Sequence, residues 1–246
     1  MIGGLLVAVG FLTRIPVPTG VFDDARARRH SLAWYPLVGA LIGLLLGALA
    51  WALPSDRPML AAALMLLAWV ALTGALHLDG LADSADAWIG GMGADPATSR
   101  TRTLEIMKDP RSGPAGVTAV VLVLLLKFAA LASLPAAAWS SLWIAPLLAR
   151  VAATAAFVTT PYVRAGGLGS GLSDAPRSAC LGTIALGVSA CVAAGVHGAI
   201  AAACVFGVFV LWRRACIRRI GGITGDTTGA LIEMSEAAAL VVLALA

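Results

Sequence analysis

Apolar stretches of about twenty residues follow one another along most of this chain, each long enough to cross the hydrocarbon core of a bilayer as a helix. Hydrophobic residues make up 60% of the 246 positions and charged residues only 12%. That composition is more apolar than a soluble core of this size requires. We therefore predict an all-α, polytopic membrane helix bundle of about six to seven transmembrane helices, forming a single domain over residues 1–246.

The expected spans begin and end where apolar runs meet polar segments. They cover residues 31–53, 59–78, 115–134, 141–160, 178–195, 196–212 and 228–246. The first thirteen residues lack a basic segment before them and a cleavage site after them, so we expect an interfacial or re-entrant helix there instead of a removable signal peptide. The four cysteines lie in or beside apolar stretches without the close pairing of a zinc site or redox dithiol, and we interpret them as small apolar residues.

The basic residues predict the orientation of the bundle. When alternate loops are assigned to the cytoplasm, starting with the first, fourteen of the seventeen Lys and Arg residues lie on that side, as the positive-inside rule requires. These fourteen are Arg14, Arg26, Arg28, Arg29, Arg100, Arg102, Lys108, Arg111, Arg164, Arg177, Arg213, Arg214, Arg218 and Arg219. The net charge of +4 is thus a topology signal, and we expect a lipid bilayer and no nucleic acid as the partner surface. Every loop carboxylate except Asp56 also lies on the cytoplasmic side, which predicts an active site there.

Three acids follow an apolar span in the segment His77-Leu78-Asp79-Gly80-Leu81-Ala82-Asp83-Ser84-Ala85-Asp86. If the helix continues, the spacing i, i+4, i+7 puts Asp79, Asp83 and Asp86 on one face, where their carboxylates converge. Converged anions repel one another unless a cation neutralises them, and oxygen-only ligands favour Mg²⁺. The alternative is a solvated helix end or pairing with loop arginines. We favour a divalent metal site, because charge so close to a bilayer is usually functional.

A second polar stretch, residues 221–233, is rich in glycine and small hydroxyls and again borders a span. Its backbone N–H groups and the following helix N-terminus are suited to a phosphate or diphosphate, although a simple connection between helices needs no such function. Asp226 and Glu233 are seven residues apart and can face the same interior. Glu233 lies inside an apolar segment, which favours the functional interpretation, and Glu236 extends it.

Several basic residues have two interpretations each. Lys108 and Arg111 are suited to phosphates but are equally typical of positive-inside markers. Arg14 is either fixed near the polar site by the prolines that follow it or anchored to lipid phosphate. Within the spans, Lys127 and Arg150 either pair with the acids or snorkel. His77 is a base or, as we slightly favour, a packed interface histidine.

Several separate motifs, in the same order and over nearly the whole chain, resemble the cobalamin synthase family of adenosylcobinamide-GDP ribazoletransferases. The matching stretches are Phe11-Leu12-Thr13-Arg14-Ile15-Pro16-Val17-Pro18, Tyr35-Pro36-Leu37-Val38-Gly39, His77-Leu78-Asp79-Gly80-Leu81-Ala82-Asp83, Leu104-Glu105-Ile106-Met107-Lys108-Asp109 and Thr224-Gly225-Asp226. Two positions depart from the family pattern: Pro110 replaces an expected serine, and Thr228 an expected apolar residue. Neither departure removes an ionisable group.

The resemblance implies a Mg²⁺-dependent attack by α-ribazole, or its 5′-phosphate, on adenosylcobinamide-GDP, with release of GMP, in the bacterial inner membrane. It implies that Asp79, Asp83 and Asp86 are catalytic metal ligands. It also implies substrate contacts by Arg14, Lys108, Arg111, Thr224, Asp226 and Glu233. The sequence is compatible with a monomer and with a homo-oligomer.

Two other functions stay open. A CDP-alcohol-type phosphotransferase also places several aspartates at the end of a membrane helix, but its usual pattern of paired Asp residues is not reproduced here. A transporter would carry acids near the middle of its spans and two similar halves. The acids of the two polar motifs lie at span ends instead, which favours the transferase.

Overall fold

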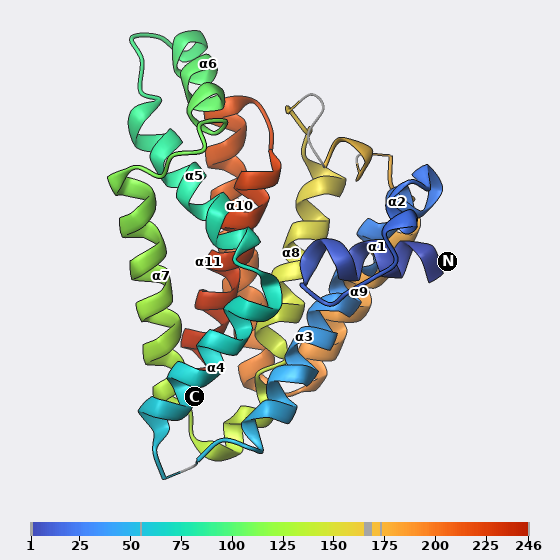
Figure 1. Cartoon of the computed structure of the whole chain (residues 1–246), viewed down its shortest axis with the longest axis vertical. Helices are drawn as coiled ribbons and strands as arrows, with labels where there is room; N and C mark the ends of the chain where they lie inside the picture. Colours follow the sequence, from blue (N-terminus) through green and yellow to red (C-terminus); the bar gives the residue numbers. More distant parts are fainter. Residues whose placement is uncertain (1, 55, 165–168, 173, 246) are drawn as a thin grey trace.

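The computed structural model describes residues 2–54, 56–164, 169–172 and 174–245. Within these residues the chain forms helices and no named strand (Figure 1). The α-helices are α1 (Ile2–Leu12), α2 (Ala25–Ser31), α3 (Tyr35–Ala50), α4 (Pro58–Thr73), α5 (Leu76–Gly90), α6 (Pro96–Ile106), α7 (Pro114–Ser133), α8 (Ile144–Thr159), α9 (Arg177–Ala193), α10 (Val196–Ile220) and α11 (Gly225–Ala244). Short 3₁₀ turns, η1 (Thr19–Phe22), η2 (Leu32–Trp34), η3 (Ala136–Ser141) and η4 (Ser170–Leu172), lie between some of them.

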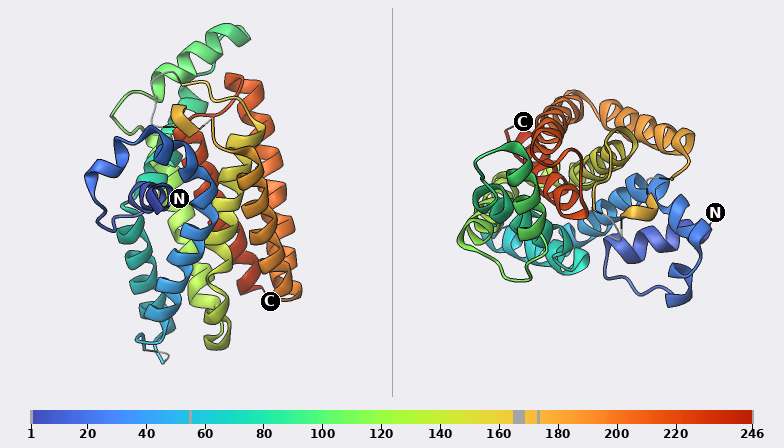
Figure 2. Two further views of the ribbon diagram at one scale, coloured as in Figure 1. Left: turned by 90° about the vertical axis from the view of Figure 1, so that its right-hand side faces the viewer. Right: turned by 90° about the horizontal axis from the view of Figure 1, so that it is seen from above.

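The long helices run side by side along the long axis of the molecule (Figure 2). In the described residues, five helical segments are long and apolar enough to cross a membrane, and α4 with α5 passes the same test as one bent pair. The predicted polytopic all-α bundle is therefore confirmed. Each predicted span overlaps a helix, but the span 59–78 is interrupted, and α9, at 17 residues, is not among the helices long enough to cross a membrane. The predicted end of the last span, residue 246, lies outside the described residues.

The helices differ in how deeply they are buried. The apolar windows of α8 and α11 are each 72% buried, whereas that of α10 is 17% buried. Helix α11 packs against α5, α7, α8 and α10, and α3 packs along α8. Helices α8 and α11 thus form the inner part of the bundle, and the outer helices present leucine and phenylalanine to lipid.

Helix α1 lies across the long axis of the molecule, beside α2 and α3 (Figure 1). Its 11 residues span roughly 16 Å, too short to cross a bilayer. It packs against α2 and contributes Phe11 and Leu12 to a cavity described below. This placement agrees with the prediction that the first thirteen residues form an interfacial or re-entrant helix.

The predicted span 59–78 is interrupted. Helix α4 ends at Thr73, and Gly74 and Ala75 both adopt left-handed backbone conformations, with φ of 64° and 59°. Helix α5 then leaves at 87° to α4. Hydropathy does not distinguish this break from a continuous span, because the residues on both sides are apolar. The bend turns α5 toward the end of the bundle where α6 lies (Figure 1).

The predicted loop over residues 213–227 is largely helical, which corrects the sequence analysis. Helix α10 continues to Ile220 and ends at Gly221, whose φ is 79°. The loss of hydropathy at Arg213 therefore marks the point where the helix leaves the apolar layer and not its last residue. Arg219 is held there by bonds from Nε to Thr103 Oγ1 at 2.9 Å and from Nη2 to the Trp88 carbonyl oxygen at 3.0 Å.

Three glycines lie four residues apart in α3, at positions 39, 43 and 47, and two of them allow close helix packing. A Cβ at Gly39 would lie 2.9 Å from Leu147 Cα, and one at Gly43 would meet the backbone of Trp143, so both glycines let α3 approach α8 closely. At Gly47 a Cβ would meet nothing within 4 Å.

Candidate active site

Helices α5 and α11 approach each other at their glycines, and this contact builds the site. A Cβ at Gly80 would lie 2.7 Å from the Asp226 carbonyl oxygen and 3.0 Å from its Cα. A Cβ at Gly229 would lie 3.3 Å from His77 Cα. Larger residues at these positions would push the helices apart. The glycine between two acid positions of α5 therefore brings them beside the amino end of α11.

A cavity of about 340 Å³ opens beside this contact. It is lined by Phe11, Leu12, Tyr35, Leu76, His77, Asp79, Gly80, Phe157, Tyr162, Arg164, Gly169, Leu172, Gly225, Asp226, Thr228, Gly229 and Ile232. Most of this lining is apolar or aromatic, and charged groups contribute only Asp79, Asp226 and Arg164. An apolar pocket with a few converging charged groups is typical of small-molecule sites.

The charged groups of the cavity, Asp79, Asp226 and Arg164, together with the neighbouring Asp83, form what we call the site cluster. Arg164 Nη1 donates to Asp226 Oδ2 at 2.6 Å. The carboxyl groups of Asp79 and Asp226 lie close enough to Asp83 to interact with it electrostatically. Three carboxylates and one guanidinium give a net formal charge of −2 when all are ionised. The cluster therefore has a surplus of negative charge that a cation would relieve.

Arg164 is positioned by a short backbone pairing after α8. The Ile223 N–H donates to the Pro161 carbonyl at 2.8 Å, and the Val163 N–H donates to the Ile223 carbonyl at 2.9 Å. This isolated parallel bridge fixes the segment after α8 against the start of α11. Arg164 is thereby placed next to Asp226.

The predicted convergence of three acids on α5 is partial: Asp79 and Asp86 both interact electrostatically with Asp83. Asp86 lies on the same helix as Asp79 and Asp83, but its carboxylate accepts from the Gly113 N–H at 2.6 Å and the Gly116 N–H at 2.8 Å. It thus caps the amino end of α7, where backbone N–H groups have no partner within their own helix. Among the residues that the structure describes, no three His, Cys, Asp or Glu side chains gather around one point as metal ligands.

Thr224, expected in a phosphate cradle, stabilises the helix that follows it. Its side chain accepts from the Thr227 N–H at 3.2 Å, and the Thr227 hydroxyl accepts from the Thr224 N–H at 2.8 Å, which completes a capping box. Thr224 is fully buried yet also lines a second, smaller cavity of about 210 Å³. Asp226 lies in the first turn of α11, where the helix dipole favours negative charge.

Lys108 and Arg111 have different surroundings. Lys108 is exposed and lines the second cavity together with Arg164 and Thr224. Arg111 is exposed and forms an ion pair with Asp109, with Nη2 and Oδ2 2.7 Å apart. Hydrogen bonds from the Arg111 side chain and backbone lower the pKa of Asp109 to about 2. Lys108 therefore lies near the site cluster, because it lines the same cavity as Arg164. Arg111 pairs with Asp109 instead.

Arg14 lies over the break between α4 and α5. Its N–H donates to the Leu72 carbonyl at 2.7 Å, and its side chain covers the face of Gly74 so closely that a Cβ there would collide with it. The predicted placement near the polar site is in keeping with this position, because Leu76 and Asp79, just after the break, line the cavity.

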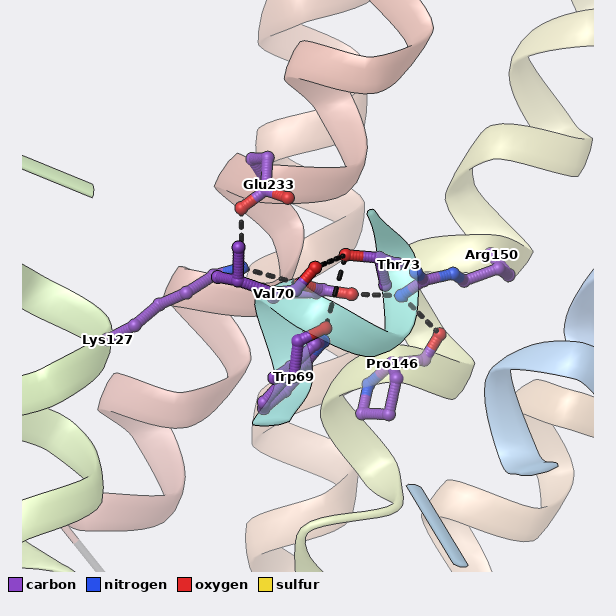
Figure 3. Close-up of polar contacts among 8 residues, drawn as sticks. Trp69, Val70, Thr73, Lys127, Pro146, Arg150 and Glu233 are labelled. Atoms are coloured by element: carbon purple, nitrogen blue, oxygen red, sulfur yellow. Dashed lines mark hydrogen bonds and ion pairs between the residues drawn. The ribbon is translucent and has the colours of Figure 1, made fainter. Parts of the chain in front are cut away.

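Glu233 lies away from the cavity, which revises its expected role as a substrate contact. Deeper in the bundle, Lys127 Nζ on α7 lies 2.5 Å from Glu233 Oε2 and 2.5 Å from Glu236 Oε2, and Arg150 on α8 bonds Glu236 Oε1 (Figure 3). We call these four residues the ion cluster. All are buried, and their two positive and two negative charges balance. Of the two interpretations left open for Lys127 and Arg150, the structure shows pairing with acids, namely Glu233 and Glu236.

His77 is a buried histidine between the two clusters. It is 3% exposed, and neither ring nitrogen has a hydrogen-bond partner among the described residues. Arg150, Glu236 and Lys127 all act on it electrostatically. The favoured interpretation, a histidine packed at a helix interface, agrees with this burial.

Sequence patterns alone do not identify Arg164 or the aromatic walls of the cavity as parts of the site. Arg164 was only one of fourteen bases on the predicted cytoplasmic side. Phe11 and Tyr35 come from α1 and α3, whereas Phe157 and Tyr162 come from the end of α8 and the segment after it, so no single spacing connects all four. The signal that could have been used for Arg164 was its position after the aromatic Tyr162 at the end of a span.

The fold and the site together define a polytopic membrane protein with an acidic small-molecule site at one end of its helix bundle. Comparison with known sequences makes the assignment specific: the family described as cobalamin-5-phosphate synthase matches residues 4–244, and the chain belongs to that family. It is 53% identical to the adenosylcobinamide-GDP ribazoletransferase of Stutzerimonas stutzeri, over 98% of this chain and 97% of that protein. Proteins with the same name from Pseudomonas paraeruginosa and Pseudomonas aeruginosa are 50% and 49% identical, over 98% of this chain and 97% of theirs. No solved structure matches the chain.

Proposed function

We propose that this chain transfers the adenosylcobinamide phosphoryl group from adenosylcobinamide-GDP to α-ribazole or its 5′-phosphate. In this reaction a ribose hydroxyl forms a bond to the phosphorus next to cobinamide, the diphosphate bridge breaks, GMP leaves and the hydroxyl loses its proton. The observation that carries the proposal is the site cluster beside a nucleoside-sized cavity, in a chain that shares about half its residues with proteins named for this activity. Family membership favours this transferase over the CDP-alcohol phosphotransferase and the transporter.

The residues of the site cluster have distinct tasks in this reaction. Asp226 and Asp79 lie where the hydroxyl and the diphosphate meet, and a carboxylate there orients the hydroxyl by accepting its hydrogen bond. Arg164 holds Asp226 in place and offers its other N–H groups to phosphate oxygens. Lys108, across the second cavity from Thr224, adds a point charge for the diphosphate.

The donor set of the site cluster fits Mg²⁺. All three acids offer carboxylate oxygens, and Arg164 neutralises only one of their charges. Mg²⁺ in phosphoryl-transfer sites is usually held by one or two carboxylates together with substrate phosphates and water, so three gathered protein ligands are not required. We assign Asp79 and Asp83 to this role, with Asp86 capping α7. When bound, Mg²⁺ neutralises charge on the transferred and leaving phosphates.

Purified protein supplied with both substrates tests the reaction directly. We expect GMP only when adenosylcobinamide-GDP and α-ribazole are both present, and we expect EDTA to abolish its release and added Mg²⁺ to restore it. GMP released from adenosylcobinamide-GDP alone would indicate simple hydrolysis instead. Full activity in EDTA would remove the metal from the proposal.

We also infer that the site end of the bundle faces the cytoplasm of a bacterial inner membrane, where nucleotides are available. The fourteen-to-one bias of loop bases supports this orientation. In a Cys204→Ala background, exposed cysteines replacing Arg100 and Arg218 should react with an impermeant thiol reagent only from the cytoplasmic side, and one replacing Arg57 only from the other side. Labelling of Arg100→Cys and Arg218→Cys from opposite sides would contradict the single shared site.

A further inference from the structure

The larger cavity has walls made of two stacked aromatic pairs. The ring centroids of Phe11 and Tyr35 are 6.4 Å apart, and those of Phe157 and Tyr162 are 5.8 Å apart. All four rings line the cavity, together with aliphatic side chains such as Ile232. Such walls favour a flat, apolar ring system over a polar or strongly charged one.

Resting on the proposed function, we propose that this cavity is the acceptor subsite and binds the base of ribazole, a riboside of dimethylbenzimidazole. A bicyclic base with methyl groups matches the aromatic walls, and its ribose then extends to the site cluster. There the ribose hydroxyl lies beside Asp79 and Asp226, as the transfer requires.

The hydrogen-bonding groups of the cavity fit this base better than guanine. Guanine presents several donors and acceptors along one edge, and a buried site that left them unpaired would bind it weakly. Away from the site cluster, the side chain with a hydroxyl left over is Tyr35, which is 2% exposed and has no hydrogen-bond partner among the described residues. The Thr228 hydroxyl already donates to the Thr224 carbonyl at 2.8 Å. His77 also lines the cavity, and its two ring nitrogens have no partner in the described part of the chain. These nitrogens and the Tyr35 hydroxyl are the neutral groups that can meet the single free ring nitrogen of a benzimidazole riboside.

The size and position of the two cavities separate the substrates. A corrin ring is far bulkier than a nucleoside and does not fit about 340 Å³. Arg164 lines both cavities, and the second one also has Lys108. The acceptor therefore approaches the Arg164–Asp226 pair from the aromatic side and the diphosphate from the Lys108 side. This arrangement brings the hydroxyl and the reacting phosphorus together beside the Arg164–Asp226 pair, each from its own cavity.

Phe157→Ala tests the assignment by steady-state kinetics with each substrate varied in turn. We expect the KM for ribazole to rise about tenfold, from the lost ring contact, while the KM for adenosylcobinamide-GDP stays unchanged. Phe128→Ala is the matched control, because Phe128 lines an apolar groove between α4 and α7 away from the site. Tyr35→Phe, which removes only the hydroxyl, should raise the KM for ribazole with little change in kcat.

A second variant and a binding assay keep the test independent of turnover. Leu76 is 41% exposed and lines the cavity, so Leu76→Trp should fold and narrow it. In equilibrium dialysis with radiolabelled α-ribazole, wild type should retain the ligand and Leu76→Trp should not. If Phe157→Ala raised the KM for adenosylcobinamide-GDP instead, or Leu76→Trp bound ribazole like wild type, the assignment would be wrong. Failure of the proposed function is a different result: wild type would then release no GMP.

Discussion

Two groups of charged side chains lie along α11, and they are built on opposite principles. The site cluster, at the amino end of the helix, has three carboxylates and one arginine, and its members are exposed or half-buried. The ion cluster lies roughly 10–15 Å further along the helix and pairs two carboxylates with two cations. Its four residues are almost completely buried.

The difference follows from the cost of charge in an apolar medium. An unpaired charge within a bundle in lipid is expensive, so the deeper acids are matched by Lys127 and Arg150. At the end of the bundle, water and ions reach the carboxylates, and a surplus of charge is tolerable and useful. The presence of acids alone therefore does not identify a catalytic site in a membrane helix; their charge balance does.

The largest expected effect is on the ion cluster. Lys127→Met leaves Glu233 and Glu236 with less compensating charge and should lower the free energy of unfolding by about 3–5 kcal/mol. Thermal unfolding in detergent would measure this change. Lys108→Met, which removes an exposed lysine, should leave the midpoint unchanged, and adding Glu233→Gln to Lys127→Met should restore part of the loss. If Lys127→Met were as stable as wild type, the charge balance of the ion cluster would not be needed for stability.

Asp83→Asn should have the opposite signature, a loss of activity without a loss of stability. Removing one of the three carboxylates of the site cluster should lower kcat roughly 100- to 1000-fold, by analogy with the loss of one electrostatic contact in other active sites. GMP release and thermal unfolding would be measured on the same preparation, with Asp56→Asn in the opposite loop as the control. Near-normal turnover would remove Asp83 from the mechanism.

Arg164→Ala tests the single cation of the site cluster. Losing its bond to Asp226 and its contact with phosphate should cost about 1.5–3 kcal/mol, a rise of roughly 10- to 100-fold in the KM for adenosylcobinamide-GDP. Arg164→Lys should recover part of it. Arg57→Ala, which breaks an exposed pair with Asp56, should change neither activity nor stability. Equal effects of the two alanine substitutions would refute a specific role for Arg164.

The smallest effect is expected for Asp86→Asn, and it separates capping from metal binding. Loss of charge at the amino end of α7 should lower stability by about 1–2 kcal/mol and lower kcat far less than Asp83→Asn does. Paired unfolding and kinetic measurements would decide. If Asp86→Asn lowered kcat as much as Asp83→Asn does, Asp86 would be a metal ligand and not only a helix cap.

The sequence predicted the helices and the acidic motif well, because both depend on local patterns. Hydropathy located a helix at each predicted span but not the break at Gly74 and Ala75, and the i, i+4 spacing put Asp79 and Asp83 on one helix beside the site. It did not reveal that Asp86 caps α7 or that Glu233 pairs with Lys127, since those partners lie 27 and 106 positions away. Arg164 and the aromatic walls were missed for the same reason: they lie far apart in the sequence, and the fold brings them together around the cavity.

The Asp86 cap also bears on how the chain could be divided. The two hydrogen bonds to Asp86 hold the start of α7 against α5, so they connect the two ends of the segment 87–112 that contains α6. The turn near Asp95, at the exposed far end of this segment, is then a suitable place to cut the chain. Two fragments separated there should remain associated and copurify, so the protein could be expressed in two complementary pieces.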